Sequence, residues 1–98
     1  MLFAIIAQDK PNGLDHRMAV RPTHLKHLAS LGDTLVFAGP FVDDAGNACG
    51  SLVVIEAASL EEGKALAAAD PFVKEGVFAA YEVKRWNWGI NNPDKRGQ

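Results

Sequence analysis

A histidine and two arginines share one side of a predicted helix in this sequence. Arg17, Arg21 and His24 follow one another at i, i+4 and i+7, which brings side chains to one face of an α-helix. Leu28 continues the same stripe, so the three basic groups lie on the side expected to pack inward. Imidazole exchanges a proton near neutral pH, and an arginine can hold an anionic oxygen. The pattern indicates either acid–base chemistry at His24 or a packed core histidine, and for the arginines it equally allows that only their stems are buried while their charged ends stay in water.

Asp70 is the carboxylate that could complete such a site. It lies between the second predicted helix and Pro71, and a residue before proline avoids helical geometry. Two interpretations stay open. Asp70 caps the turn that begins at Pro71, or it orients His24 as in a His–Asp dyad. The first role is structural, whereas the second makes His24 a general base or acid.

Other chemistries find less support. His24 and His27 are three residues apart, but no carboxylate or cysteine completes a metal-binding set at ligand spacing, so we expect no metal. Cys49 is the only cysteine, so an internal disulfide is excluded. It lacks a partner motif and is therefore a weak candidate for a nucleophile. The sequence has no phosphate-binding loop, dinucleotide fingerprint or serine elbow, so we expect no cofactor.

Length and charge restrict the remaining classes. The 98 residues fit one domain over residues 1–90, followed by a polar tail over 91–98 that we expect to be frayed. The net charge is −2 and the basic residues are scattered, which argues against a nucleic-acid partner. The apolar N-terminal run is too short to span a membrane and lacks the basic start of a signal peptide. We therefore expect a cytoplasmic protein without a membrane partner.

The elements that must position these residues alternate in type. The helical period covers Asp15 to Leu31, where Pro22 either introduces a kink or begins the firm part, and Gly32 ends the helix. A second helix begins at Ser59, which has capping-box spacing with the glutamate three residues later. Apolar runs predict strands over residues 2–8, 34–40, 51–57 and 77–88. The order β-α-β-β-α-β predicts an α+β, ferredoxin-like fold with helices on one face of a four-stranded antiparallel sheet.

Two further features concern the sheet. Several strands carry apolar residues on both faces, as in Val53 and Val54, and one chain supplies helices for one face only. We therefore expect a homodimer in which two sheets pack face to face. Gly39 and Pro40 close one strand, and Ser51 begins the next, where these residues either shape the hairpin or admit a ligand.

Several short motifs resemble the YciI-like (YCII-related) proteins in their order and spacing. They are FAIIAQDKPNGLDHR near the N-terminus, RPTHL around His24, AGP at 38–40, GS at 50–51 and ADPFVKEGVF from residue 69. The resemblance covers roughly residues 2–85 and implies a dimeric α+β barrel with a cleft that holds His24 and Asp70. It also places near that cleft, or in the same motifs, the residues that we expect to contact a ligand: Arg17, Arg21, Gly39, Pro40, Ser51 and Phe72.

The resemblance implies a small cofactor-independent enzyme that acts by proton transfer or elimination on a small, cyclic or aromatic, acid. His24 would move the proton, Asp70 would fix its tautomer, and an arginine or Ser51 would hold an anionic oxygen. The wider superfamily includes lactone isomerases and small monooxygenases, and a YciI-type domain has been linked to dehydrochlorination. The alternative is a non-catalytic metabolite-binding or accessory protein that uses the same cleft. The loop over residues 41–49 is short for the family and is expected to border the cleft.

Overall fold

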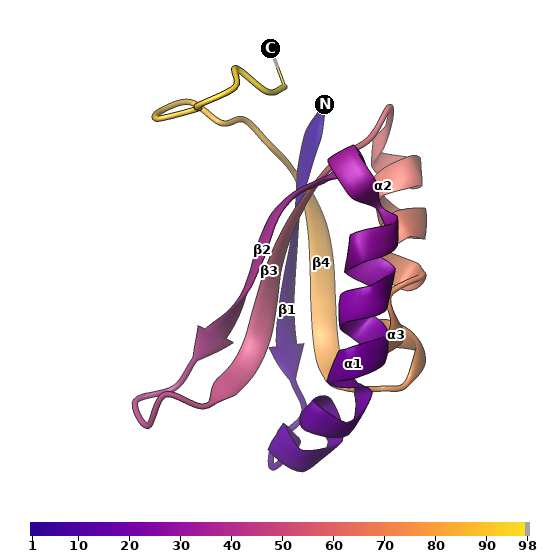
Figure 1. Cartoon of the computed structure of the whole chain (residues 1–98), viewed down its shortest axis with the longest axis vertical. Helices are drawn as coiled ribbons and strands as arrows, with labels where there is room; N and C mark the ends of the chain where they lie inside the picture. Colours follow the sequence, from indigo (N-terminus) through magenta and orange to yellow (C-terminus); the bar gives the residue numbers. More distant parts are fainter. Residues whose placement is uncertain (98) are drawn as a thin grey trace.

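Four antiparallel strands form one sheet, in the order β2-β3-β1-β4, in the computed structural model, which describes residues 1–97. The strands are β1 (Leu2–Asp9), β2 (Leu35–Val42), β3 (Ala48–Glu56) and β4 (Phe78–Trp86). The helices are α1 (Leu14–Ser30), the 3-10 turn η1 (Gly32–Thr34), α2 (Leu60–Ala68) and α3 (Pro71–Lys74). The three α-helices cover the same face of the sheet (Figure 1). The predicted ferredoxin-like arrangement is therefore confirmed.

The β2–β3 hairpin is longer than the sequence pattern indicated. The ladder continues to Val42 and starts again at Ala48, so only residues 43–47 connect the strands. The carboxylate of Asp43 accepts hydrogen bonds from two backbone N–H groups of this connection, at 3.0 Å each. An Asp that bonds its own following backbone stabilises a tight turn. The tip of the hairpin is thus compact.

Helix α1 runs through Pro22 without ending. Figure 1 shows its first turns set at an angle to the rest, as expected where a proline removes a backbone donor. The helix ends as predicted, because Gly32 follows its C-cap with a φ of 55° that favours glycine. Arg17, His24 and Leu28 of the predicted stripe are buried. Leu25 of the same stripe is 43% exposed, because it borders a cavity described below.

The caps of α2 and α3 follow the sequence signals. Ser59 accepts the N–H of Glu62, and the Glu62 side chain accepts the N–H of Ala58, each at 3.2 Å. Asp70 accepts the N–H of Phe72 at 2.9 Å and so caps α3. Side-chain acceptors of this kind satisfy the free donors at a helix start.

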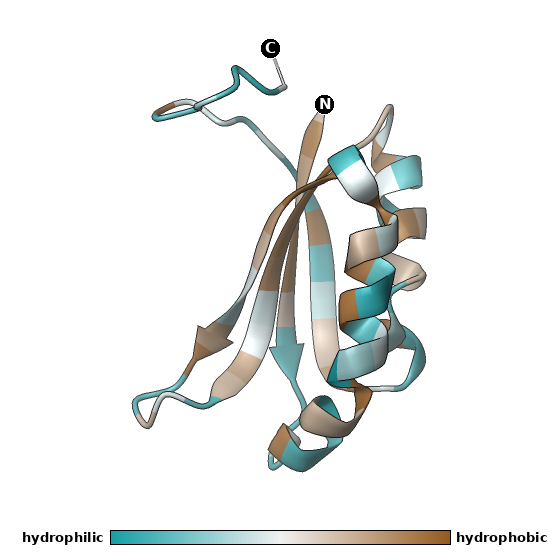
Figure 2. Ribbon diagram, in the orientation of Figure 1, coloured by the Kyte–Doolittle hydropathy of each residue, from teal (hydrophilic) through white to brown (hydrophobic). Residues whose placement is uncertain are grey.

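The core on the helix side has two parts, and hydrophobic residues run along the strands beneath it (Figure 2). The part between the sheet, α1 and α2 contains Phe3, Ile5, Leu28, Val53, Ile55, Ala57 and Ala67. The part around α3 contains Ala7, Phe72, Val77 and Phe78. Phe72 is fully buried, so α3 anchors the end of the sheet that lies beside α1.

The opposite, open face of the sheet is partly covered by this chain's own aromatic residues. Leu2 and Val54 are each only 1% exposed, although none of the helices within residues 1–97 lies on this side. Phe37 makes edge-to-face contacts with Trp86 and Trp88, at ring-centroid distances of 5.8 and 5.3 Å. These rings pack over the two aliphatic residues. One chain therefore covers more of its sheet than the sequence argument allowed.

The C-terminal tail, residues 91–97, extends this cover. We expected it to be frayed, but it packs against the rest of the chain. It folds back across the open face at the end of the sheet where β1 begins (Figure 1). Arg96 donates to the carboxylate of Glu56 at 3.3 Å, and the backbone of Gly97 packs against the side chain of Leu2. The tail is polar in sequence but is held by these contacts.

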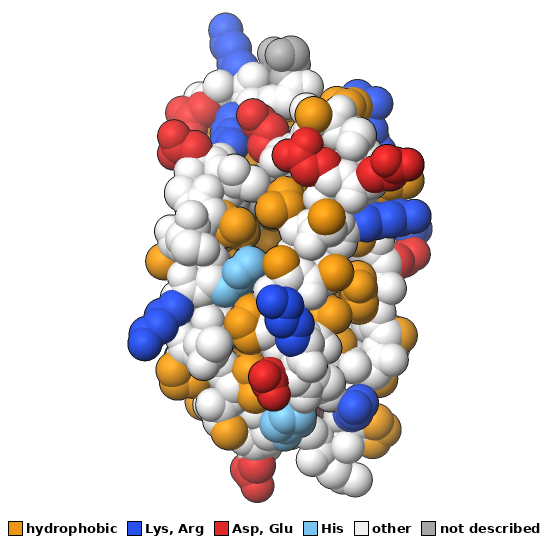
Figure 3. Space-filling view, turned by 90° about the vertical axis from the view of Figure 1, so that its right-hand side faces the viewer, with side chains coloured by type: hydrophobic (Ala, Val, Ile, Leu, Met, Phe, Trp, Pro, Cys, Tyr) orange, Lys and Arg blue, Asp and Glu red, His pale blue; other side chains and the backbone are white. Residues whose placement is uncertain are grey.

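The outer face of the helices carries both signs of charge. Figure 3 shows Lys and Arg side chains dispersed over it, with acidic side chains gathered toward one end and hydrophobic groups between them. Of the helices within residues 1–97, none is sufficiently long and apolar to span a membrane.

Candidate active site

A cavity of about 190 Å³ opens between α1 and the β2–β3 hairpin. Its polar side chains are Arg17, Arg21 and His24, all from α1. Its remaining lining is apolar or glycine and comes from α1, the hairpin and α3: Met18, Leu25, Leu28, Ala38, Gly39, Pro40, Ala48 and Phe72. Known ligand pockets are typically about 300–1,000 Å³, so this one suits a ligand near the small end of that range.

His24 is held by Asp70 and faces this cavity. Nδ1 of His24 lies 2.8 Å from Oδ1 of Asp70, and both side chains are less than a tenth exposed. A carboxylate accepts hydrogen bonds, so Nδ1–H donates, and in the neutral form of the ring Nε2 carries the lone pair. Within residues 1–97, Nε2 has no hydrogen-bond partner. Every buried side-chain nitrogen of these residues does have one, so Nε2 is not itself buried. Nε2 is therefore open to the cavity and can accept a proton there.

The same oxygen of Asp70 serves two elements. Oδ1 accepts the Phe72 N–H as well as the His24 contact, so the capping and dyad interpretations hold together geometrically. The ring of Phe72 also stacks on His24, with centroids 3.8 Å apart and planes 9° from parallel. One carboxylate and one aromatic face thus restrict both the tilt and the rotation of the imidazole.

Arg17 lies in a buried network that joins three elements. Its Nη1 donates to both carboxylate oxygens of Asp9, at 2.9 and 3.0 Å, and its Nη2 donates to Oγ of Ser51 at 2.8 Å. Its guanidinium also lies over the ring of Phe72, 4.6 Å from the centroid. Asp9 was not among the predicted site residues, because it follows the strand predicted over residues 2–8. The available signal was an acidic residue directly after a buried apolar strand.

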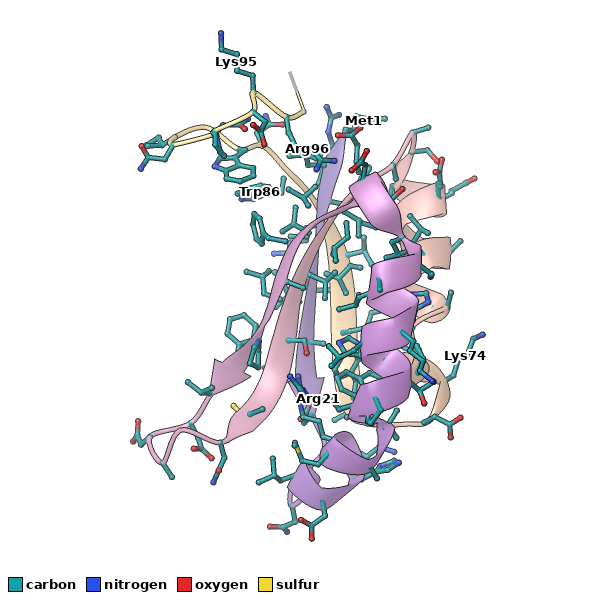
Figure 4. The ribbon with its side chains drawn as sticks, in the orientation of Figure 1. Met1, Arg21, Lys74, Trp86, Lys95 and Arg96 are labelled. Carbon is teal, nitrogen blue, oxygen red and sulfur yellow. The ribbon has the colours of Figure 1, made fainter. Side chains whose placement is uncertain are left out.

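Arg21 is different from Arg17. It borders the cavity and is exposed, and within residues 1–97 it has no side-chain hydrogen bond or ion pair. Figure 4 shows it in the space between α1 and the strands. Its charge is therefore available to a ligand.

The residues of the hairpin divide between wall and support. Gly39 and Pro40 border the cavity, and a Cβ on Gly39 would meet open space. Ser51 faces Pro40 in the β2–β3 register but is 2% exposed and bonded to Arg17, so it does not line the cavity. Gly50 is needed for packing, since a Cβ there would clash with the backbone oxygen of Ala7 in β1. Only Gly39 of the two glycines therefore lies where a ligand could approach.

Metal ligands are not gathered at this site. Over residues 1–97, no three side chains of the types His, Cys, Asp and Glu come close enough to hold an ion. Cys49 is exposed and lies outside the lining of this cavity.

Several known proteins are similar to this chain. The family described as YCII-related domain matches residues 1–87. Protein YciI from Escherichia coli O6:H1 and from Shigella flexneri is 47% identical over 92 residues, covering 86% of this chain and 94% of theirs. An uncharacterized protein from Haemophilus influenzae is 40% identical with the same coverage.

Solved structures share the fold. The 5-chloro-2-hydroxyhydroquinone dehydrochlorinase of Burkholderia phenoliruptrix, in complex with 2,5-dihydroxybenzoquinone, is 35% identical, with a TM-score of 0.80. The match covers 89% of this chain and 94% of that one. Protein Atu4242 from Agrobacterium tumefaciens is 17% identical with a TM-score of 0.56 over 95% of this chain and 98% of that one, a likeness of fold alone. Since the family match spans nearly the whole chain and its relatives align over most of their own length, the chain belongs to the YCII-related family.

Proposed function

We propose that this protein is a cofactor-independent enzyme that moves a proton of a small, cyclic or aromatic, acid. The observation that carries the proposal is His24, whose Nδ1 is held by Asp70 while Nε2 is open to a cavity. A buried, oriented imidazole beside a pocket is the arrangement that general acid–base catalysis requires. The dehydrochlorinase with the same fold supports proton transfer or elimination on a small ring.

The residues take separate parts in this scheme. Nε2 of His24 accepts a proton from the substrate, and Asp70 holds the tautomer and stabilises the imidazolium that forms. In an elimination, the electron pair of the broken bond to hydrogen forms the new double bond, and the leaving group departs with its own pair. In an isomerisation, His24 returns the proton to another atom. The proposed substrate-binding wall consists of Arg17, Arg21, Gly39, Pro40 and Phe72. Ser51 does not line this wall but positions Arg17 by accepting its hydrogen bond.

The proposal is tested by replacing His24 with Asn. Small cyclic acids, including 5-chloro-2-hydroxyhydroquinone, are incubated with the protein in D₂O and followed by NMR for product or for exchanged hydrogen. We expect the variant to lose turnover by about 10²–10⁴-fold, the usual contribution of a positioned acid or base. His16→Asn is the matched control, because His16 is an exposed histidine of the same helix. Undiminished turnover by the His24 variant would remove it from the mechanism.

A second function, metabolite binding without turnover, is favoured by one observation. Asp70 already caps α3, so its bond to His24 also serves a structural purpose. Under this reading, the same compounds bind without being converted, and the His24 variant loses stability rather than activity. Saturable binding with no product and no exchange in any compound of the panel would favour this reading over catalysis.

The assembly that we propose is a cytoplasmic homodimer without a nucleic-acid or membrane partner. Phe41 lies on the open face of the sheet and is 44% exposed, beside a hollow of about 510 Å³ that Ile6 and Gly50 also line. The chain's own tail covers the other end of this face. A second copy packed on the uncovered part would bury this apolar surface.

A further inference from the structure

The two arginines of the cavity lie one turn apart on α1 and have opposite environments. Arg17 is 5% exposed and makes three hydrogen bonds, two to Asp9 and one to Ser51. Arg21 is exposed, borders the same cavity, and has no such partner among residues 1–97. Arg17 is thus a structural cation that the protein itself binds, whereas the guanidinium of Arg21 makes no such bond within residues 1–97.

The charge of Arg17 is already neutralised. The side chain of Asp9 is 5% exposed, so the two opposite charges face each other away from water. An anionic ligand near Arg17 would have to share the guanidinium with this carboxylate and would be repelled by it. Arg17 therefore holds α1 against the strands and offers little net attraction to an anion.

The charge of Arg21 has no counter-ion among residues 1–97 and lies near His24 on the helix. The spacing i, i+3 places their Cβ atoms about 5–6 Å apart on one side of the helix. A planar guanidinium without a partner binds the two oxygens of a carboxylate through two parallel N–H donors. If the anionic group of a ligand binds Arg21, another atom of the ligand, on the far side of a single ring, can face Nε2 of His24.

The rest of the cavity restricts the body of that ligand. Leu25, Leu28 and Pro40 provide apolar walls, and the volume of about 190 Å³ is too small for a nucleotide-sized compound. We propose that Arg21, and not Arg17, binds the anionic group of the ligand, and that the ligand is a single-ring or similarly small monoanion. The inference rests on the proposed function and names the substrate class of that site.

The test compares two probes of equal shape and different charge, benzoate and benzamide. Their dissociation constants are measured by NMR titration for the wild-type chain, Arg21→Gln and Lys26→Gln, the last an exposed cation of the same helix. We expect Arg21→Gln to weaken benzoate by about tenfold or more, the usual effect of losing a charge-assisted hydrogen bond. Benzamide should be unaffected, and Lys26→Gln should bind both probes as the wild type does.

Arg21→Lys gives a second measurement. It keeps the charge but loses the fork of donors, so benzoate affinity should fall between those of the wild type and Arg21→Gln. The inference is overturned if Arg21→Gln binds benzoate as tightly as the wild type, or if the wild type does not prefer benzoate to benzamide. Loss of turnover in His24→Asn with unchanged benzoate binding in Arg21→Gln would keep the proposed function and remove this inference.

Discussion

At the scale of single residues, the site depends on one oxygen atom. Oδ1 of Asp70 accepts hydrogen bonds from the imidazole of His24 and from the first backbone N–H of α3. Phe72 follows in the chain, and its ring stacks on the same imidazole. The orientation of His24 is therefore coupled to the start of a short helix. Asp70 caps a helix and also holds the proposed base. Substitutions that keep its acceptor oxygen but remove its charge show which of the two properties matters.

Replacing Asp70 with Ala or with Asn makes that distinction. Ala removes the cap and leaves Nδ1 of His24 buried without an acceptor, so we expect a loss of about 2–4 kcal/mol in the free energy of unfolding. Asn keeps an acceptor oxygen and is a good N-cap, so its loss should be under about half of that. Urea denaturation measures both. Equal losses would mean that the carboxylate charge, rather than the two hydrogen bonds, stabilises this region.

The residues that sequence reasoning identified share a helix face or a motif. The spacing of Arg17, Arg21 and His24 follows from the helical period, and Asp70 stands before a proline at a helix junction. Asp9 lies within the quoted motif FAIIAQDKPNGLDHR, but it is on no predicted helix face and does not precede a proline. Its pairing with Arg17 depends on where β1 ends relative to the first turns of α1, a distance that only the folded chain sets. A carboxylate between a strand and a turn is most often exposed, and here it is buried.

At the scale of elements, the network of Arg17 fastens α1 to the sheet. It links the end of β1, the first half of α1 and the start of β3 through Asp9 and Ser51. This half of the helix lies before Pro22, where the axis changes direction. A helix interrupted by proline lacks a backbone hydrogen bond there, so side-chain contacts must hold its first turns. The cavity wall formed by Met18 and Arg21 then depends on this attachment.

The attachment predicts a strongly non-additive pair of substitutions. Arg17→Met leaves the carboxylate of Asp9 buried without a counter-ion and should cost about 3–5 kcal/mol of unfolding free energy. Adding Asp9→Leu removes that isolated charge, so the double variant should recover much of the loss. Thermal and urea unfolding of the two single variants and the double variant give the coupling. Additive losses would show that the ion pair does not hold the elements together.

The order and type of the elements follow from local signals. Gly32 after α1 and the Ser59–Glu62 pair at α2 specify ends through backbone geometry and caps, which a short stretch of sequence contains. Strand length does not follow in this way. On β2 the ladder continues past Pro40 through Phe41 and Val42. On β3 it starts at the small residues Ala48–Gly50, before the apolar run, because hydrogen bonds between strands join backbones and need no apolar side chains.

At the scale of the whole molecule, the two ends of the open face are covered differently. The tail shields the end near Leu2 through Arg96 and Gly97, and Trp88 packs beside it, so the position of the tail depends on contacts far apart in sequence. A polar segment with glycine and proline carries no local pattern that indicates such packing, which explains why the tail was expected to be frayed. The other end of the face keeps Phe41 exposed. The proposed dimer interface is thus limited to the part that the tail leaves free.

Phe41→Lys tests this interface directly. A lysine on an apolar surface that faces a second copy would bury an unpaired charge, so we expect the dimer dissociation constant to rise by at least about tenfold. Leu60→Lys is the matched control, because Leu60 is 42% exposed against 44% for Phe41 but lies on the helix side. Light scattering coupled to size exclusion, over a dilution series in the micromolar range, gives the mass of each variant. We expect the wild type and Leu60→Lys to remain dimeric where Phe41→Lys is monomeric. A monomeric wild type would refute the dimer, and a Phe41→Lys variant as dimeric as the control would move the interface to another surface.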